Sequence, residues 1–219
     1  MSRRQAFRLL WLGFAAAFAV LAWQFREHLD TLWSARGELT VEERPGEVVL
    51  RWRGLIEAPL AAKLDDAYRA HSAGTRRFVI ALHSPGGTLE HGREVIGLIR
   101  RMQRTHLVDT VVEDRRACGS MCVPVYLAGK RRTAAPRARF MFHEVSFRDS
   151  LSGKIEQVPK EAIGRATDQF FERYLKPAGL DQRWLADLRE AIRGRNVWRT
   201  AEELIEQRSG VVHELEPAP

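Results

Sequence analysis

The sequence has little cysteine and lacks the patterns by which several classes of protein can be recognised. Two cysteines among 219 residues are too few for the disulfide framework of a small secreted domain. No group of ligands has the spacing of a zinc site, so we predict no metal. The dinucleotide-binding GxGxxG pattern and the P-loop lysine pattern are both missing, and we predict no cofactor. There is no internal repeat or low-complexity tract either.

Charge and composition describe a basic globular protein. Apolar residues make up 45% of the chain and charged residues 29%, as in ordinary folded domains, so disorder is not expected. The formal net charge is +7, but the surplus is scattered over short clusters without interleaved aromatic residues or a nucleic-acid motif. We therefore expect no nucleic-acid partner. A solvated basic face beside an anionic membrane accounts for the charge.

The first 30 residues have the pattern of a membrane anchor. Arg3, Arg4 and Arg8 precede a stretch without charge from residue 9 to residue 25. As a helix this stretch would be about 26 Å long, at about 1.5 Å per residue, which is the short end of what crosses a bilayer. Its apolar residues surround all faces of such a helix, unlike those of an amphipathic core helix.

A cleavable signal peptide is the alternative for this segment. It would need small residues after the apolar stretch, but the sequence there is LAWQFRE, and Trp23 suits a membrane interface. We therefore predict that residues 1–30 form a cytoplasmic stub and a single span of the cytoplasmic membrane. Residues 31–46 are predicted to be a polar stalk, and residues 47–219 a periplasmic domain.

Strand-like and helix-like segments alternate through this domain, which predicts an α/β fold with a mostly parallel sheet and a helical C-terminal third. The predicted strands are 48–53, 77–82, 107–113 and 138–145. The predicted helices are 58–71, 88–104, one beginning near Ser120, 158–176, 181–193 and 200–207. Residues Ile163, Phe170, Phe171 and Tyr174 form an apolar stripe suited to packing on the domain or on another subunit, so a homo-oligomer is an open alternative.

The segment RRACGSMCVPVYLAG, residues 115–129, places Ser120 at the start of an apolar helix. Serine is a poor nucleophile unless a base takes its proton and hydrogen-bond donors hold the oxyanion. The first amides of a helix have no partner within the helix, so the Met121 amide would be such a donor. Pro124 supports this placement, because a proline in the first turn removes no helical hydrogen bond.

Cys118 and Cys122 flank Ser120 at a spacing of four residues. On a helix this spacing brings the two Cα atoms to about 6 Å, within the range of a disulfide. Two small buried side chains would explain the pair equally well, so both alternatives stay open.

Two further segments contain residues that could take part in binding or catalysis. HSPGGTLEHG, residues 83–92, puts two glycines between a strand and a helix, where the backbone can approach a ligand closely. A plain turn would also explain them. His143 ends a later predicted strand, where a lone histidine is more often structural than catalytic. Together with Ser120, these features indicate more than any one of them alone.

In this order the features resemble the Clp family of serine peptidases, whose repeated β-β-α superhelix is related to the crotonases. The resemblance runs from about residue 48 to His143: SPGG after a strand, GSM opening an apolar helix that ends in AG, the basic turn KRR, and a strand ending in histidine. It implies that Ser120 is the nucleophile, that His143 is the general base and that the Gly87 and Met121 amides form the oxyanion hole. It also implies a peptide or protein substrate bound as an added strand.

The resemblance does not assign the third catalytic residue. Aligning VWRTAEELIEQRSGVV with the closing motif of the family puts that position near Ala191, which is not a carboxylate. Asp187 and Glu190 are the nearest acids, and Asp149 is another candidate. A serine–histidine pair without an acid would keep part of the rate.

The sequence therefore predicts a membrane-anchored serine endopeptidase. The main alternative is a relative that binds peptides or a partner at the membrane but has lost hydrolysis, because the acid is missing from its expected place. A crotonase-like enzyme that uses Glu144, and a Ser/Lys peptidase that uses Lys130 or Lys160, are further alternatives. Ring assembly and an ATP-driven unfolding partner are not expected of an extracytoplasmic chain.

Overall fold

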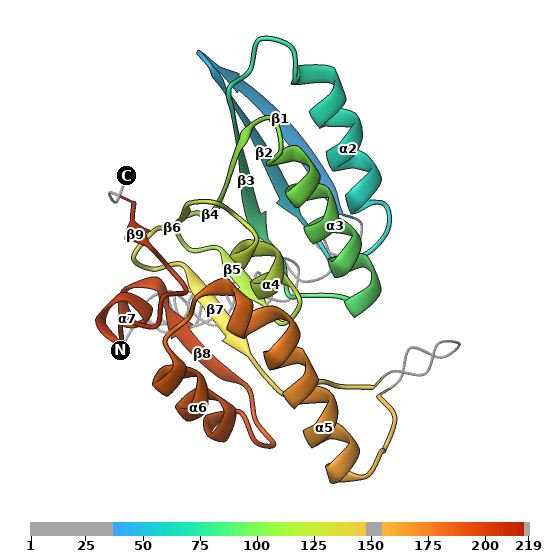
Figure 1. Ribbon diagram of the computed structural model, residues 1–219, viewed down its shortest axis with the longest axis vertical. Coiled ribbons are helices and arrows are strands. Elements are labelled where there is room, and N and C mark those ends of the chain that lie inside the picture. The colour runs from blue at the N-terminus through green and yellow to red at the C-terminus, as the bar shows by residue number, and fades with distance from the viewer. Residues whose placement is uncertain (1–36, 148–154, 217–219) are drawn as a thin grey trace, which may run out of the picture. The chain divides into compact units, whose positions relative to one another are not determined.

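The computed structural model describes residues 37–147 and 155–216 (Figure 1). The chain divides into two units, residues 1–36 and 37–219, and only the second contains described residues. The predicted anchor at residues 9–25 and the candidate acid Asp149 both lie outside them. Of the helices in the described ranges, none has the length and apolar character needed to span a bilayer.

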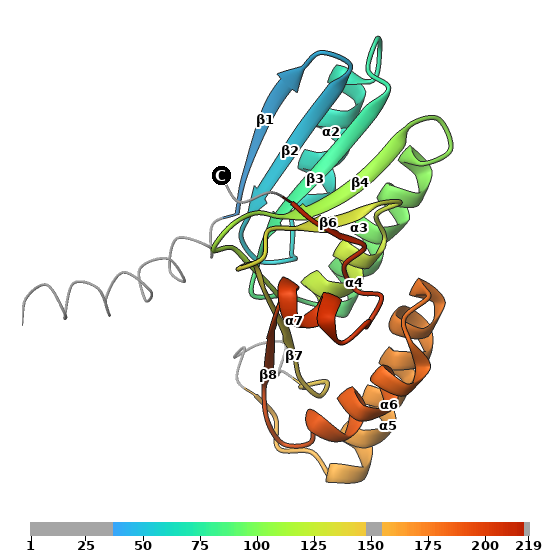
Figure 2. The same cartoon turned by 90° about the vertical axis from the view of Figure 1, so that its left-hand side faces the viewer.

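A six-stranded sheet forms the larger part of the domain, and two helices cover one of its faces (Figure 2). Its strands lie in the order β1-β2-β3-β4-β6-β9, with β1 antiparallel to β2 and the other neighbours parallel. The strands are β1 (Glu38–Arg44), β2 (Glu47–Arg53), β3 (Arg77–His83), β4 (Leu107–Val112), β6 (Arg132–Ala134) and β9 (Glu214–Leu215). The covering helices are α2 (Leu60–His71) and α3 (Leu89–Met102).

A second sheet has three strands in the order β5-β7-β8. They are β5 (Ala117–Gly119), β7 (Arg139–Phe142) and β8 (Val197–Thr200). An isolated pairing of Ser84 with Cys118 joins the end of β3 to β5, so the two sheets meet at this point. The remaining helices are α4 (Cys122–Leu127), α5 (Lys160–Phe170), α6 (Gln182–Ala191) and α7 (Ala201–Glu206).

Alternate residues of the central strands pack into the main core beneath the helices. Leu50, Trp52 and Ile80 are almost completely buried there, whereas Val49 and Ala81 belong to a smaller apolar cluster. Successive side chains of a strand point to opposite faces, so β2 and β3 have some buried apolar residues on both sides. The main core therefore lies on the face that the helices cover.

The predicted α/β class and mostly parallel sheet are confirmed, but several elements differ. Residues 38–44 of the predicted stalk form the edge strand β1, which has no buried residue and therefore little hydrophobic pattern. The predicted helix 158–176 is α5 followed by a π-helical turn (Phe171–Leu175) and a 3₁₀ turn. Phe171 of the predicted stripe is buried in the core, and Phe170 and Tyr174 pack against it. Packing within the domain accounts for these aromatic residues.

Arg132 joins three segments that are far apart in the chain. Its guanidinium donates to the carbonyl oxygens of Leu127 at 3.4 Å, Ala178 at 3.1 Å and Gly210 at 2.7 Å. Burial lowers the pKa of Arg132. A cation at the end of a helix interacts favourably with the helix dipole. Arg132 thus holds the far end of α4, the helix that begins beside Ser120.

Candidate active site

Ser120 occupies a sharp turn between β5 and α4. Its φ is +51°, a left-handed conformation that is uncommon for a residue other than glycine. Its amide donates to the Met141 carbonyl at 2.9 Å, and its carbonyl accepts from the Val123 amide at 3.0 Å. Backbone strain of this kind persists where the surroundings enforce it, and it is concentrated at functional sites.

His143 meets Ser120 because of the way in which β5 and β7 pair. The two strands are parallel, with Gly119 opposite Met141. Parallel strands point the same way, so the residues that follow them emerge at the same edge of the sheet. The distance from His143 Nε2 to Ser120 Oγ is 2.8 Å. This distance allows a proton to pass directly from the hydroxyl to the imidazole.

The glycine loop after β3 lies directly against Ser120. Gly86 has a φ of +117°, and a Cβ atom there would lie 2.6 Å from Ser120 Cβ and 3.2 Å from the Met121 amide nitrogen. Any side chain at Gly86 would therefore push the loop away from Ser120. The pair of glycines reflects this close approach and not only the need for a turn.

The Gly87 amide follows the loop residue that contacts Ser120, and the Met121 amide follows Ser120 in the chain. The Ile56 amide donates to the Gly86 carbonyl at 2.7 Å, and the Thr88 amide donates to the Ile56 carbonyl at 3.2 Å. In such a parallel pairing the amide of Gly87, which lies between the two bonded residues, points away from Ile56. Neither amide has an acceptor within the described residues. The Gly87 and Met121 amides therefore stay the predicted donors of an oxyanion hole.

A disulfide joins Cys118 to Cys122 across the Ser120 turn. The two Cα atoms are 5.2 Å apart, and both cysteines are completely buried. The structure therefore has a disulfide here, and not two separate buried thiols. The bond connects β5 to the first residue of α4.

Asp187 and Glu190, the acids nearest to the expected third position, both lie on α6. Glu190 is largely exposed and pairs with Arg193 at 2.8 Å. Asp187 lines a surface hollow of about 470 Å³ together with Trp184. Across residues 37–147 and 155–216, no hydrogen bond or ion pair joins either acid to His143. A catalytic role for either acid therefore stays a prediction.

Arg189 lies between those two acids on α6, and its side chain contacts the segment that contains His143. It pairs at 3.4 Å with Glu144, the residue after His143, and at 2.7 Å with Asp168 of α5. Glu144 also accepts a hydrogen bond from the Gly194 amide at 2.9 Å. The side chain of Arg189 is only 17% exposed, so this cluster fastens the segment that presents His143. The sequence does not predict this contact, because Arg189 and Glu144 are 45 residues apart and form no local pattern.

The two lysines of the Ser/Lys alternative are both exposed. Lys130 follows the far end of α4, and Lys160 is the first residue of α5. Neither makes a hydrogen bond to Ser120 in the described part of the chain, whereas His143 does. Of the bases considered from the sequence, His143 is the one in contact with the hydroxyl.

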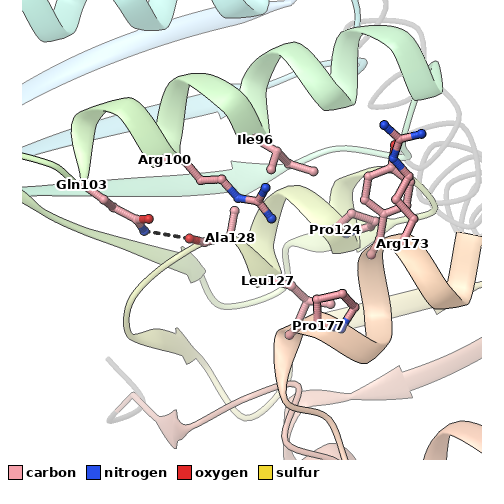
Figure 3. Close-up of a pocket in the computed structure, with 10 residues that line it drawn as sticks. Ile96, Arg100, Gln103, Pro124, Leu127, Ala128, Arg173 and Pro177 are labelled. Atoms are coloured by element: carbon pink, nitrogen blue, oxygen red, sulfur yellow. Dashed lines mark hydrogen bonds between the residues drawn. The ribbon is translucent and has the colours of Figure 1, made fainter.

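A separate hollow lies next to α4 (Figure 3). Its volume is about 130 Å³, and Arg100, Pro124 and Arg173 are among the residues that line it. Neither Ser120 nor His143 is one of them. This hollow is therefore not part of the candidate active site.

Comparison with known proteins identifies the fold. No family model and no curated protein matches the sequence. Among solved structures, a ClpP1 variant from Listeria monocytogenes is 20% identical, with 80% of this chain and 92% of that chain covered and a TM-score of 0.56. A variant of the 1510-N membrane-bound stomatin-specific protease is 16% identical, with 77% of each chain covered and a TM-score of 0.55.

Another variant of the 1510-N protease, in complex with a substrate peptide, is 18% identical. The match covers 77% of this chain and 73% of that one, with a TM-score of 0.56. At these identities the likeness concerns the fold. The chain has the fold of the Clp-type serine peptidases.

Proposed function

We propose that this chain is a serine endopeptidase with Ser120 as the nucleophile and His143 as the general base. The observation that carries the proposal is the 2.8 Å contact between His143 Nε2 and Ser120 Oγ at a strained turn. A serine hydroxyl becomes a competent nucleophile when a base within hydrogen-bond reach can take its proton. The likeness to Clp-type peptidases supports the same reaction.

Acylation begins when Ser120 Oγ attacks the carbonyl carbon of the scissile peptide bond. The Oγ–C bond forms while the hydroxyl proton moves to His143 Nε2. The carbonyl oxygen becomes an oxyanion, which the Gly87 and Met121 amides stabilise by donating hydrogen bonds. When the intermediate collapses, the C–N bond breaks, and the imidazolium gives its proton to the departing amine.

Deacylation repeats these steps with water as the nucleophile. His143 Nε2 takes a proton from the water, whose oxygen attacks the ester carbonyl. The same two amides hold the second oxyanion. Collapse then breaks the ester bond and returns the proton to Ser120 Oγ, which releases the new carboxyl end of the substrate and restores the enzyme.

The proposal also covers the cellular location of the enzyme and the way in which it binds its substrate. Residues 9–25 would span the cytoplasmic membrane, with the N-terminus in the cytoplasm and the catalytic domain on the other side. A peptide or protein segment would bind as an added strand beside the site. The 1510-N protease, which is named as membrane-bound and was solved with a substrate peptide, supports a membrane location and a peptide substrate. A homo-oligomer stays an open prediction.

The proposal is tested by covalent labelling. A fluorophosphonate reacts preferentially with an activated serine, so we expect it to modify the purified full-length chain at Ser120. Digestion followed by mass spectrometry should find the adduct on the peptide that contains Ser120. Absence of labelling, together with measurable peptide binding, would support the non-hydrolytic alternative.

Gly86→Ala should slow the labelling of Ser120 by about 100-fold, because the new methyl group would displace the turn and a shift of about 1 Å costs about that much. Gly97→Ala is the matched control. Gly97 lies inside α3, and the nearest heavy atom to a Cβ there is 3.7 Å away. It should keep the wild-type labelling rate and raise stability by up to about 1 kcal/mol. Equal rates for both variants would contradict the role of Gly86.

A further inference from the structure

Hydrogen bonds hold the N-terminal side of the Ser120 turn. The Ser84 amide donates to the Ala117 carbonyl at 2.9 Å, and the Gly119 amide donates to the Ser84 carbonyl at 2.9 Å. The Ser120 amide donates in turn to the Met141 carbonyl at 2.9 Å. β5 is therefore fixed to its neighbours on both sides up to the nucleophile itself.

The C-terminal side of the turn has fewer backbone hydrogen bonds, although the side chains of α4 are buried. The helix α4 that follows has six residues, and one backbone hydrogen bond across the turn, from Val123 to Ser120 at 3.0 Å, is found in the described residues. The disulfide adds a covalent link on this side. It joins Cys122, the first residue of α4, to Cys118 in β5.

We propose that the Cys118–Cys122 disulfide positions Ser120, and that the chain is fully reactive only when this disulfide has formed. The inference rests on the proposed function, because it concerns the same serine. A residue other than glycine at positive φ relaxes to a commoner conformation unless its neighbours prevent it. With the disulfide, β5 and the start of α4 are tied together. Without it, the first turn of α4 can move and Ser120 Oγ can leave its place 2.8 Å from His143.

The redox step is a thiol–disulfide exchange with a dithiol. The S–S bond breaks, Cys118 and Cys122 become thiols, and the dithiol that supplies two electrons and two protons becomes a cyclic disulfide. Both cysteines are completely buried, so a folded chain exchanges slowly. The state of the pair is then set while the chain folds. A chain folded in a reducing compartment is therefore poorly reactive, and one folded in an oxidising compartment is fully reactive.

The test compares rates of fluorophosphonate labelling for three forms of the full chain. They are the oxidised wild type, the wild type refolded with dithiothreitol, and Cys118→Ala/Cys122→Ala. Alkylation under denaturing conditions followed by intact-mass measurement reports the state of the cysteines. At saturating reagent, the two forms without the disulfide should label about 10- to 100-fold more slowly, because a small misplacement of a reacting group costs that much. Refolding the reduced wild type with oxidised glutathione should restore the rate.

Leu64→Ala is the matched control for lost stability. Leu64 is completely buried on α2, so its truncation lowers the unfolding temperature without altering the Ser120 turn. At a temperature where circular dichroism shows every form to be folded, the Leu64→Ala variant should be labelled at the wild-type rate. The proposal is overturned if the disulfide-free forms label as fast as the oxidised wild type. It is also overturned if the labelling rate of Leu64→Ala falls as much as theirs. It is also overturned if neither disulfide-free form folds, because the disulfide then acts on the whole fold.

Failure of this inference can be told apart from failure of the proposed function. If the oxidised wild type does not label at all, the proposed peptidase activity is wrong. If it labels at Ser120 and the rate does not depend on the disulfide, only the positioning role is wrong.

Discussion

Ser120→Ala should lower kcat for peptide hydrolysis by at least about ten-thousandfold, because the variant has no hydroxyl beside His143 Nε2. The residual rate would come from substrate binding and from the Gly87 and Met121 amides, which the substitution leaves in place. The affinity for a peptide substrate should change little. Hydrolysis of a fluorogenic peptide gives the rate, and fluorescence anisotropy with the same peptide gives the affinity.

Ser72→Ala is the control for this substitution. Ser72 follows α2, and its hydroxyl donates to the Arg69 carbonyl at 3.4 Å. The variant loses one hydroxyl at a place with no role in the proposed chemistry, so it should hydrolyse the peptide at the wild-type rate. Substantial hydrolysis by Ser120→Ala would mean that another residue is the nucleophile.

His143→Gln should cause a loss of similar size, again at least about ten-thousandfold in kcat. Glutamine keeps a polar group near Ser120 Oγ but cannot accept the hydroxyl proton at neutral pH. Because the two residues act as a unit, the double variant Ser120→Ala/His143→Gln should be no slower than the slower single variant. Additive losses would indicate that the two side chains work in separate steps. Steady-state kinetics of the three variants decides between these outcomes.

His71→Gln controls for the loss of a histidine. His71 ends α2 and contacts Glu43 at 3.2 Å, in a part of the chain that contributes nothing to the site. Its removal should leave kcat unchanged. If His143→Gln were as active as His71→Gln, a different base would have to serve Ser120, and Lys130 and Lys160 would return as candidates.

The periodic, strongly apolar segments were predictable because they form their pattern locally. The predicted strand 77–82 is β3 (Arg77–His83), and the predicted helix 88–104 is α3 (Leu89–Met102). The edge strand β1 has no buried residue, so its sequence resembles a polar stalk. The short strand β8 (Val197–Thr200) has one buried residue and was also missed. Pairing with a neighbouring strand, and not a local pattern, makes such segments into strands.

The candidate site also has parts that the sequence predicts and parts that it does not. Ser120, the glycine pair and Pro124 have local signals, because each is required by the geometry of its own turn or helix start. The arrangement around His143 does not. Arg189 reaches Glu144 only because α6 folds back against the segment after β7. Of the acids considered from the sequence, Asp149 lies outside the described residues. Glu190 pairs with Arg193, and Asp187 lines a hollow on α6. A catalytic role for any of the three stays a prediction.

The sequence by itself therefore determined the α/β class, the order of the main elements, and a serine at a helix start preceded by a glycine loop. These features follow from periodicity and turn chemistry, which act over a few residues. The tertiary structure decided that His143 Nε2 lies 2.8 Å from Ser120 Oγ and that Cys118 and Cys122 form a disulfide. It also decided that Arg189 fastens the segment after the histidine. Each of these depends on strand register or on the docking of separate elements, because those alone bring side chains from distant parts of the chain within bonding distance.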